Sequence, residues 1–201
     1  MMIVWRVLVF LAAAYWPLWC MAQVALAKAG PDPGNFLLQN MGIATLVMIL
    51  VVLALSPLYW LFPWQGINRV RRQLGLWCFT YAVLHLLCYL LFIIGLSFPQ
   101  FITDLSGRPY IIVGMAALVC LAALAASSPR LIADRLGNWW KRIHWLIYPA
   151  LLLALLHFFW IVRADLGEWG NYAACSLVLL LVRIPVITHL LKRIGQLVRP
   201  H

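Results

Sequence analysis

Acidic residues are scarce in this chain of 201 residues, which contains only five aspartates and glutamates in total. Charged residues of both signs make up 10% of the chain, whereas an average soluble domain has about 25%. The mean hydropathy is +0.96. This composition excludes an ordinary soluble domain and predicts an integral membrane protein.

Several motifs of other protein classes are also absent. The sequence contains neither His-Glu-x-x-His nor Gly-x-Ser-x-Gly, which argues against a membrane protease. No acid lies inside an apolar run, whereas a transporter that relays protons through histidines usually has one, so this alternative is disfavoured but stays open. No Cys-x-x-Cys-His motif is present, so any haem would be b-type, held by ligation and packing. We assign no chemistry to the five cysteines: Cys20, Cys78, Cys88, Cys120 and Cys175.

The apolar residues fall into six runs that are long enough to cross a bilayer. We expect residues 1–201 to form one all-α domain, a haem-binding bundle of six transmembrane helices, with connecting loops at 99–109 and 127–142. A cleaved signal peptide is the alternative for the first run, because Arg6, the apolar stretch and Ala25-Leu26-Ala27 resemble its three regions. The expected helices are 7–27, 36–62, 73–98, 110–126, 139–162 and 169–191.

The basic residues predict the orientation of this bundle. They cluster on alternate connections, and cytoplasmic connections carry an excess of lysine and arginine. The net charge of +10 therefore reflects membrane orientation and does not indicate nucleic-acid binding. Both termini are expected in the cytoplasm. Three basic residues then lie outside (Lys28, Arg108 and Arg163) and twelve inside (Arg6, Arg69, Arg71, Arg72, Arg130, Arg135, Lys141, Arg142, Arg183, Lys192, Arg193 and Arg199).

Three histidines lie inside the apolar runs, apart from His189 near the basic end of the last run, which we expect to be interfacial or solvated. An ionisable side chain in a membrane is costly and usually functional, and neutral imidazole is a common axial ligand of haem iron. His85 lies thirteen residues beyond Arg72, and His157 lies fifteen residues beyond Arg142. Both are then roughly 20 Å from the cytoplasmic edge on helices of the same direction. We predict that they bracket one haem in the outer half, although a lone membrane histidine more often only bonds a neighbouring helix.

His144 lies near the cytoplasmic edge, with Pro149 between it and His157, where proline can kink or locally rewind the helix. Fourteen residues before His85 the chain has Arg71, not a histidine. An inner cofactor would therefore have His144 as ligand and the arginines Arg71 and Arg72 opposite. Arg183 lies inside the last run, where it either reaches the interface or pairs with an acidic group of a cofactor, such as a haem propionate.

These residues resemble the MsrQ family, the haem-binding membrane subunits of methionine sulfoxide reductase systems. That family belongs to the wider ferric-reductase-like transmembrane group. The resemblance covers nearly all of the chain and is strongest between Arg69 and Trp160. It is carried by Arg71-Arg-Gln-Leu-Gly-Leu-Trp-Cys-Phe79, Leu84-His85-Leu86, Arg108-Pro-Tyr110, Leu136-Gly-Asn-Trp-Trp-Lys-Arg-Ile-His144, Tyr148 and His157.

The resemblance implies a function that the residues alone do not specify. It implies haem b and FMN as cofactors, the respiratory quinone pool as electron donor, and a periplasmic molybdopterin protein, MsrP, as acceptor that repairs oxidised methionines. The location would be the bacterial inner membrane. Larger relatives have a fourth membrane histidine and a flavin and nicotinamide domain, and this chain has neither. A b-type cytochrome subunit or ferric reductase with a different acceptor is the alternative.

Overall fold

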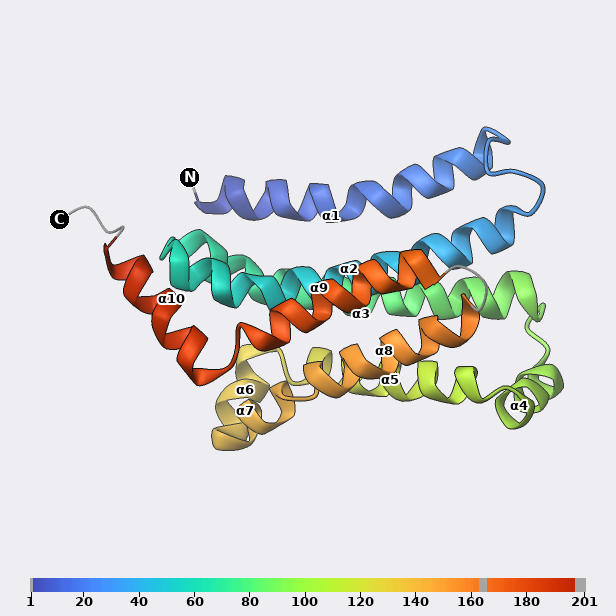
Figure 1. Ribbon diagram of the computed structural model, residues 1–201. Helices are drawn as coiled ribbons and strands as arrows, with labels where there is room; N and C mark the ends of the chain where they lie inside the picture. Colours follow the sequence, from blue (N-terminus) through green and yellow to red (C-terminus); the bar gives the residue numbers. More distant parts are fainter. Residues whose placement is uncertain (1, 163–165, 198–201) are drawn as a thin grey trace.

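The computed structural model describes residues 2–162 and 166–197, and these residues form helices with no strand among them (Figure 1). Two arginines of the charge count, Arg163 and Arg199, lie outside the described residues. A π-helical segment, η1 (Tyr89–Ile93), continues α3. The helices are α1 (Met2–Ala25), α2 (Pro33–Leu61), α3 (Gln65–Cys88), α4 (Phe98–Gly107), α5 (Pro109–Ala126), α6 (Arg130–Leu136), α7 (Asn138–His144), α8 (Ile147–Ile161), α9 (Leu166–Leu181) and α10 (Pro185–Leu197).

Five segments of the described chain are long and apolar enough to cross a membrane: α1, α2, α3 with η1, α5, and α7 with α8. The pair α9 and α10 makes a sixth if it is counted as one bent span. The architecture is therefore all-α with five or six spans, in agreement with the expected class.

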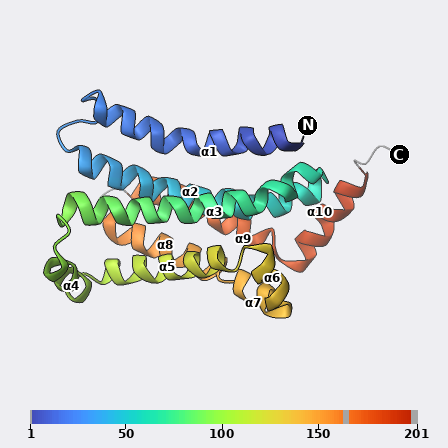
Figure 2. The same cartoon turned by 180° about the vertical axis from the view of Figure 1, so that it is seen from behind.

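Two helix pairs form the centre of the bundle. Helix α2 packs along α3, and α5 packs along α8, and the two pairs face each other (Figures 1 and 2). Small residues such as Ala82 and Ala150 let the helices approach closely in lipid. The shared buried core consists of Leu46, Ile49, Leu53, Cys78, Ala82, Leu121, Ala150, Leu151 and Leu155.

Helices α1 and α9 lie on the outside of these pairs. The hydroxyl of Tyr81 in α3 donates to the carbonyl oxygen of Ala13 in α1 at 2.6 Å. The indole of Trp169 in α9 donates to the carbonyl oxygen of Leu155 in α8 at 3.0 Å. Most of the remaining surface of α1 is exposed and apolar, as expected for a helix that faces lipid.

The stretch expected as one helix at 139–162 is broken between α7 and α8. Proline at position 149 has no N–H for the carbonyl of Trp145, and its ring crowds that carbonyl. The backbone N–H of Tyr148 bonds Trp145 instead, at 3.1 Å, in a tighter turn. The helix is therefore locally rewound just after His144, which is one of the two effects expected of Pro149.

The prediction of one continuous helix at 169–191 is wrong. Helix α9 ends at Leu181, and α10 leaves it at an angle of 78°. Pro185 explains the break, because proline disfavours helical geometry at the residue before it and supplies no N–H to the preceding turn.

Both expected loops contain helices, which the sequence reading missed. Helix α4 occupies most of 99–109, and it starts where the side chain of Ser97 accepts the backbone N–H of Gln100 at 3.3 Å. The stretch 127–142 contains α6 and part of α7, joined at Gly137, whose φ of 50° suits glycine. Helix α3 also begins eight residues earlier than expected, at Gln65 rather than Gln73.

The orientation predicts the result of reporter fusions along the full chain. Fusions after Pro31, Ser106 and Leu166 should report the periplasm, and fusions after Asn68, Asp134 and Gln196 should report the cytoplasm, because the basic clusters stay inside. Alkaline phosphatase and fluorescent-protein activities measure this. A periplasmic signal after Gln196 would contradict both the orientation and the counting of α9 with α10 as one span.

Candidate functional site

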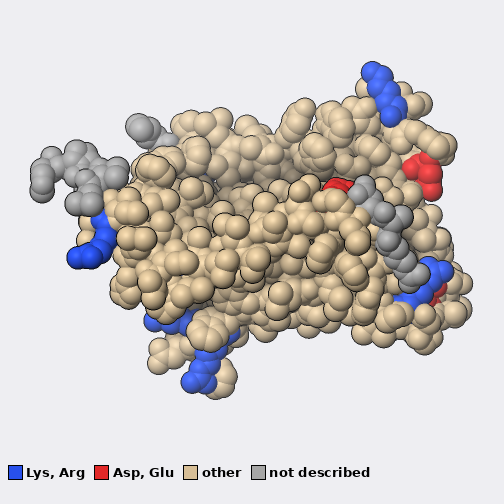
Figure 3. All heavy atoms as spheres, viewed as in Figure 1, with Lys and Arg blue, Asp and Glu red and all other residues tan. Residues whose placement is uncertain are grey.

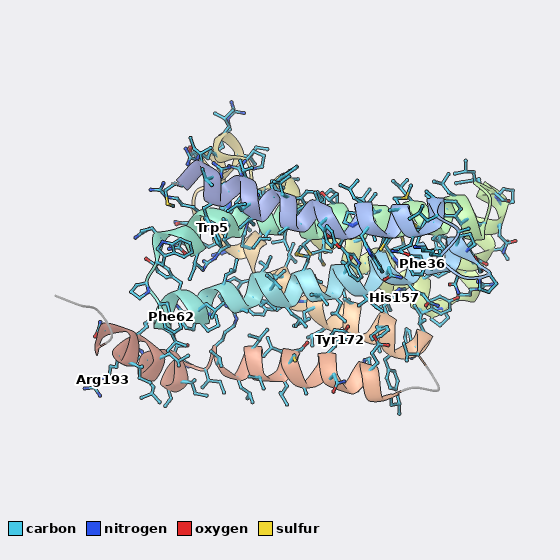
Figure 4. All side chains as sticks on the ribbon, turned by 90° about the horizontal axis from the view of Figure 1, so that it is seen from above. Trp5, Phe36, Phe62, His157, Tyr172 and Arg193 are labelled. Carbon is cyan, nitrogen blue, oxygen red and sulfur yellow. The ribbon has the colours of Figure 1, made fainter. Side chains whose placement is uncertain are left out.

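His85 and His157 meet inside the bundle, although 72 positions separate them in the chain. Figure 4 labels the position of His157. They come from α3 and α8, and their ring centroids are 6.1 Å apart, with the ring planes at 87°. The structure thus brings together the two histidines that were predicted to form a pair because they lie at equal depth in the membrane. Equal depth on neighbouring helices was sufficient to predict this contact.

A backbone carbonyl fixes the orientation of each ring. The Nδ1 atom of His85 lies 2.8 Å from the carbonyl oxygen of Leu38, and that of His157 lies 2.7 Å from the carbonyl oxygen of Tyr110. A carbonyl oxygen only accepts hydrogen bonds, so Nδ1 carries the proton in both rings. The lone pair of a neutral imidazole is then on Nε2, as in histidines that bind a metal.

A glycine lies beneath each ring, four residues after the carbonyl that holds it. A Cβ added to Gly42 would lie 2.9 Å from Cε1 of His85, and one added to Gly114 would lie 2.8 Å from Nδ1 of His157. Both contacts are closer than carbon and nitrogen atoms tolerate, so the absence of a side chain lets each ring rest on the neighbouring helix.

The sequence reading missed these two glycines, although a signal for them exists. Each histidine follows its carbonyl partner by 47 residues. Each also ends an Ala-x-Leu-His motif, at Ala82–His85 and Ala154–His157. The two helix pairs thus repeat one local arrangement of carbonyl, glycine and histidine.

This geometry fits two axial ligands of one iron. Two metal–nitrogen bonds of about 2 Å each, on opposite sides of a metal, place the two ring centroids roughly 6 Å apart. The observed separation of 6.1 Å agrees with that value. The protonated Nδ1 atoms face the backbone, which leaves Nε2 of each ring for the metal.

A polar network fastens α4 beside this histidine pair. Asp104 is only 3% exposed, and it accepts hydrogen bonds from the Tyr89 hydroxyl at 2.6 Å and the Gln100 amide at 2.8 Å. The Tyr89 bond is the main cause that holds the pKa of the Asp104 carboxyl below its ordinary value, although burial acts in the opposite direction. Arg108 lies 3.4 Å from the same carboxylate and precedes Tyr110 at the start of α5 by two residues.

His144 lies in a different environment at the other end of the bundle. Its ring packs on Trp140, with centroids 4.0 Å apart, and its Nδ1 atom lies 3.1 Å from the Trp140 carbonyl oxygen. The ring orientation of His144 is therefore set within its own helix, unlike that of the outer pair.

Arg183 turns into the bundle rather than out to the interface. Its guanidinium donates to the hydroxyl of Tyr148 at 3.0 Å and to the carbonyl oxygen of Leu53 at 2.9 Å. Arg71 lies close enough to interact electrostatically with Arg183. Arg72, the other predicted arginine, is exposed.

Two donors of this arginine pair have no acceptor among the described residues. They are the buried Nε atoms of Arg71 and Arg183. Buried N–H groups of native proteins almost always have a partner, and a guanidinium prefers an anionic oxygen. The pair can therefore bind an acidic group of a ligand.

Small substitutions test the outer pair without removing a histidine. We expect Gly42→Ala and Gly114→Ala each to displace the adjacent ring and to lower haem affinity by about 10–100-fold, the usual cost of disturbing a ligand's support.

His85→Ala and His157→Ala should each abolish the same low-spin spectrum. Haem content per purified chain and the visible spectrum measure both effects.

Gly75→Ala is the matched control, because it lies on α3 and nothing lies within 4 Å of an added Cβ there. It should keep full haem content. Wild-type spectra in both histidine variants would exclude the pairing.

Comparisons with known proteins identify the family of the chain. A model of the family described as ferric reductase like transmembrane component matches residues 41–155. The protein-methionine-sulfoxide reductase heme-binding subunit MsrQ of Xanthomonas axonopodis pv. citri (strain 306) is 39% identical over 165 residues, which cover 82% of this chain and 76% of that protein. No solved structure matches the chain.

The family match spans more than half of the chain and includes His85, His144 and both glycines of the outer site. The similarity to the Xanthomonas protein extends over most of both chains. The chain therefore belongs to the ferric reductase-like transmembrane family and, within it, to the MsrQ subunits.

Proposed function

We propose that this chain is the haem-binding membrane subunit of a methionine sulfoxide reductase system, passing electrons from the quinone pool to a periplasmic molybdopterin reductase, MsrP. The observation that carries the proposal is the pair His85 and His157, 6.1 Å apart with both Nδ1 atoms held by backbone carbonyls. The name of the Xanthomonas relative supports the assignment to this system.

The membrane location is consistent with such a role. The chain is a multi-pass inner-membrane protein, with five or six apolar spans in its described part. Haem b bound between His85 and His157 would supply one-electron redox chemistry in the low dielectric of the bundle. The protein itself sets the ligand orientation through Leu38 and Tyr110, and its packed helices exclude water from the rings.

The direction of transfer follows from the placement of the pair. His85 and His157 lie in the half of the bundle that contains α4, and the positive-inside count favours a periplasmic position for α4. The opposite half contains Arg71, Arg183 and His144. Electrons would therefore enter near the arginines and leave near α4.

We propose further that the inner half binds a second cofactor with acidic groups, FMN. Its phosphate would accept hydrogen bonds from the unpartnered Nε donors of Arg71 and Arg183. Arg72, the residue after Arg71, would add positive charge. A second haem ligated by His144 offers the same chemistry through its propionates. The amounts of haem and FMN in the purified protein distinguish these two cofactors.

The function is tested with the full chain purified in detergent. The protein is reduced anaerobically with a quinol analogue, MsrP and a peptide containing methionine sulfoxide are added, and the haem absorption bands are followed. Rapid reoxidation that requires both additions is expected. If the quinol-reduced haem is reoxidised only by ferric chelates or by another acceptor, the alternative function would be supported. The chain would then be a ferric reductase or a cytochrome subunit with a different partner.

The inner site is tested by cofactor content. We expect one haem and one FMN per chain in the wild type, and loss of FMN with haem retained in Arg71→Gln/Arg183→Gln, because the phosphate loses its charged partners. Arg69→Gln on the same helix, which is exposed, is the control and should keep FMN. Two haems per chain, with one lost in His144→Ala, would overturn the flavin assignment.

A further inference from the structure

Helix α10 has three distinct faces, and one of them packs closely on the end of α2. The packed face carries Gly195, which lies so close to the carbonyl oxygen of Trp60 in α2 that a Cβ would collide with it. Ile187 and Leu191 lie on the same side, at the spacing of one helical turn, and both are partly buried. This face fixes α10 against the end of α2.

The second face is apolar and open. Val186, Leu190 and Ile194 follow each other at intervals of four residues, and they are 76%, 57% and 40% exposed. Such spacing places them in one stripe along the helix. A helix that only faced water would not carry a continuous apolar stripe.

The third face is polar and positively charged. It carries Lys192 and Arg193, and an open hollow there is lined by these two residues with His189 and Gln196. Figure 4 shows Arg193 on the outside of α10, away from the bundle. The charged face borders the apolar stripe, since Arg193 lies three residues after Leu190 and is therefore its neighbour on the helix surface.

The position of α10 in the bundle indicates which medium meets these faces. The preceding helix α9 has 16 residues, about 24 Å of length, so it crosses most of the apolar core of a bilayer. The 78° bend after it turns α10 toward the membrane plane. Lys192 lies over the ring of Trp60, with Nζ 5.6 Å from the centroid, and tryptophans at helix ends mark the headgroup level.

We propose that α10 is an interfacial helix that binds anionic phospholipid, with acyl chains along Val186, Leu190 and Ile194 and the headgroup phosphate on Lys192 and Arg193. An apolar stripe beside a cationic face, on a helix parallel to the membrane, is the arrangement that recognises an anionic lipid surface. The same end of the bundle carries the basic helices α6 and α7 (Figure 3), as expected for the cytoplasmic headgroup level. This inference is independent of the proposed electron transfer.

The headgroup contact is tested by lipid retention. The full chain is purified in detergent with a mixture of phosphatidylglycerol and phosphatidylcholine, and bound lipids are counted by native mass spectrometry. We expect selective retention of phosphatidylglycerol, and a loss of apparent affinity on the order of tenfold or more in Lys192→Gln/Arg193→Gln. The control Arg130→Gln/Arg135→Gln removes the same charge from α6 and should retain the lipid.

Equal retention of both lipids by the wild type would overturn the proposal, and so would equal losses in the α10 and α6 variants, since the effect would then be one of net charge.

The apolar stripe is tested by the environment of single nitroxide labels on the full chain in nanodiscs that contain phosphatidylglycerol. The exposed Cys175 is first replaced by serine. A label on Leu190→Cys should be accessible to oxygen, which partitions into lipid, and a label on Gln196→Cys to a water-soluble nickel chelate. Accessibility of position 190 to the nickel chelate would show that water, not lipid, covers the stripe. Protection of position 190 from both reagents would indicate a protein partner there, and either result would overturn the proposal.

Discussion

A buried imidazole needs a hydrogen-bond partner for one ring nitrogen before the other nitrogen can bind a metal. The packing of the central helices meets that requirement. Helix α2 gives a carbonyl to His85, and α5 gives one to His157. Because a carbonyl only accepts, each contact sets the tautomer and directs Nε2 away from the backbone. The packing of α2 on α3 and of α5 on α8 is thus also what orients the candidate ligands.

The two ends of the bundle differ in the way they handle polar groups. At the outer end, Asp104 is satisfied by Tyr89 and Gln100, so α4 is fastened by a complete network. At the inner end, Arg71 and Arg183 keep donors without acceptors among the described residues. A complete network stabilises a structure, whereas a buried cation with an unpaired donor is a candidate site for an anionic ligand. This contrast places the ligand-binding capacity of the arginines at the inner end.

Breaks in the helices have functional consequences here. Proline at position 149 separates the helix that carries His144 from the one that carries His157, so the two rings need not share one helical face. Proline at position 185 turns α10 out of the direction of α9, and the turn leaves Arg183 directed into the bundle at the bend. Both prolines act by removing a backbone donor and by crowding the preceding turn.

The sequence by itself determined the membrane class, the approximate spans and the pairing of His85 with His157, because hydropathy and depth depend on composition and on the fixed rise of a helix. The tertiary structure alone decided the carbonyl partners, the glycines under the rings and the inward direction of Arg183, since these depend on which helices become neighbours. Helix α4 and the bend before α10 were missed for a different reason. Capping by Ser97 and the break at Pro185 are local signals that hydropathy does not report.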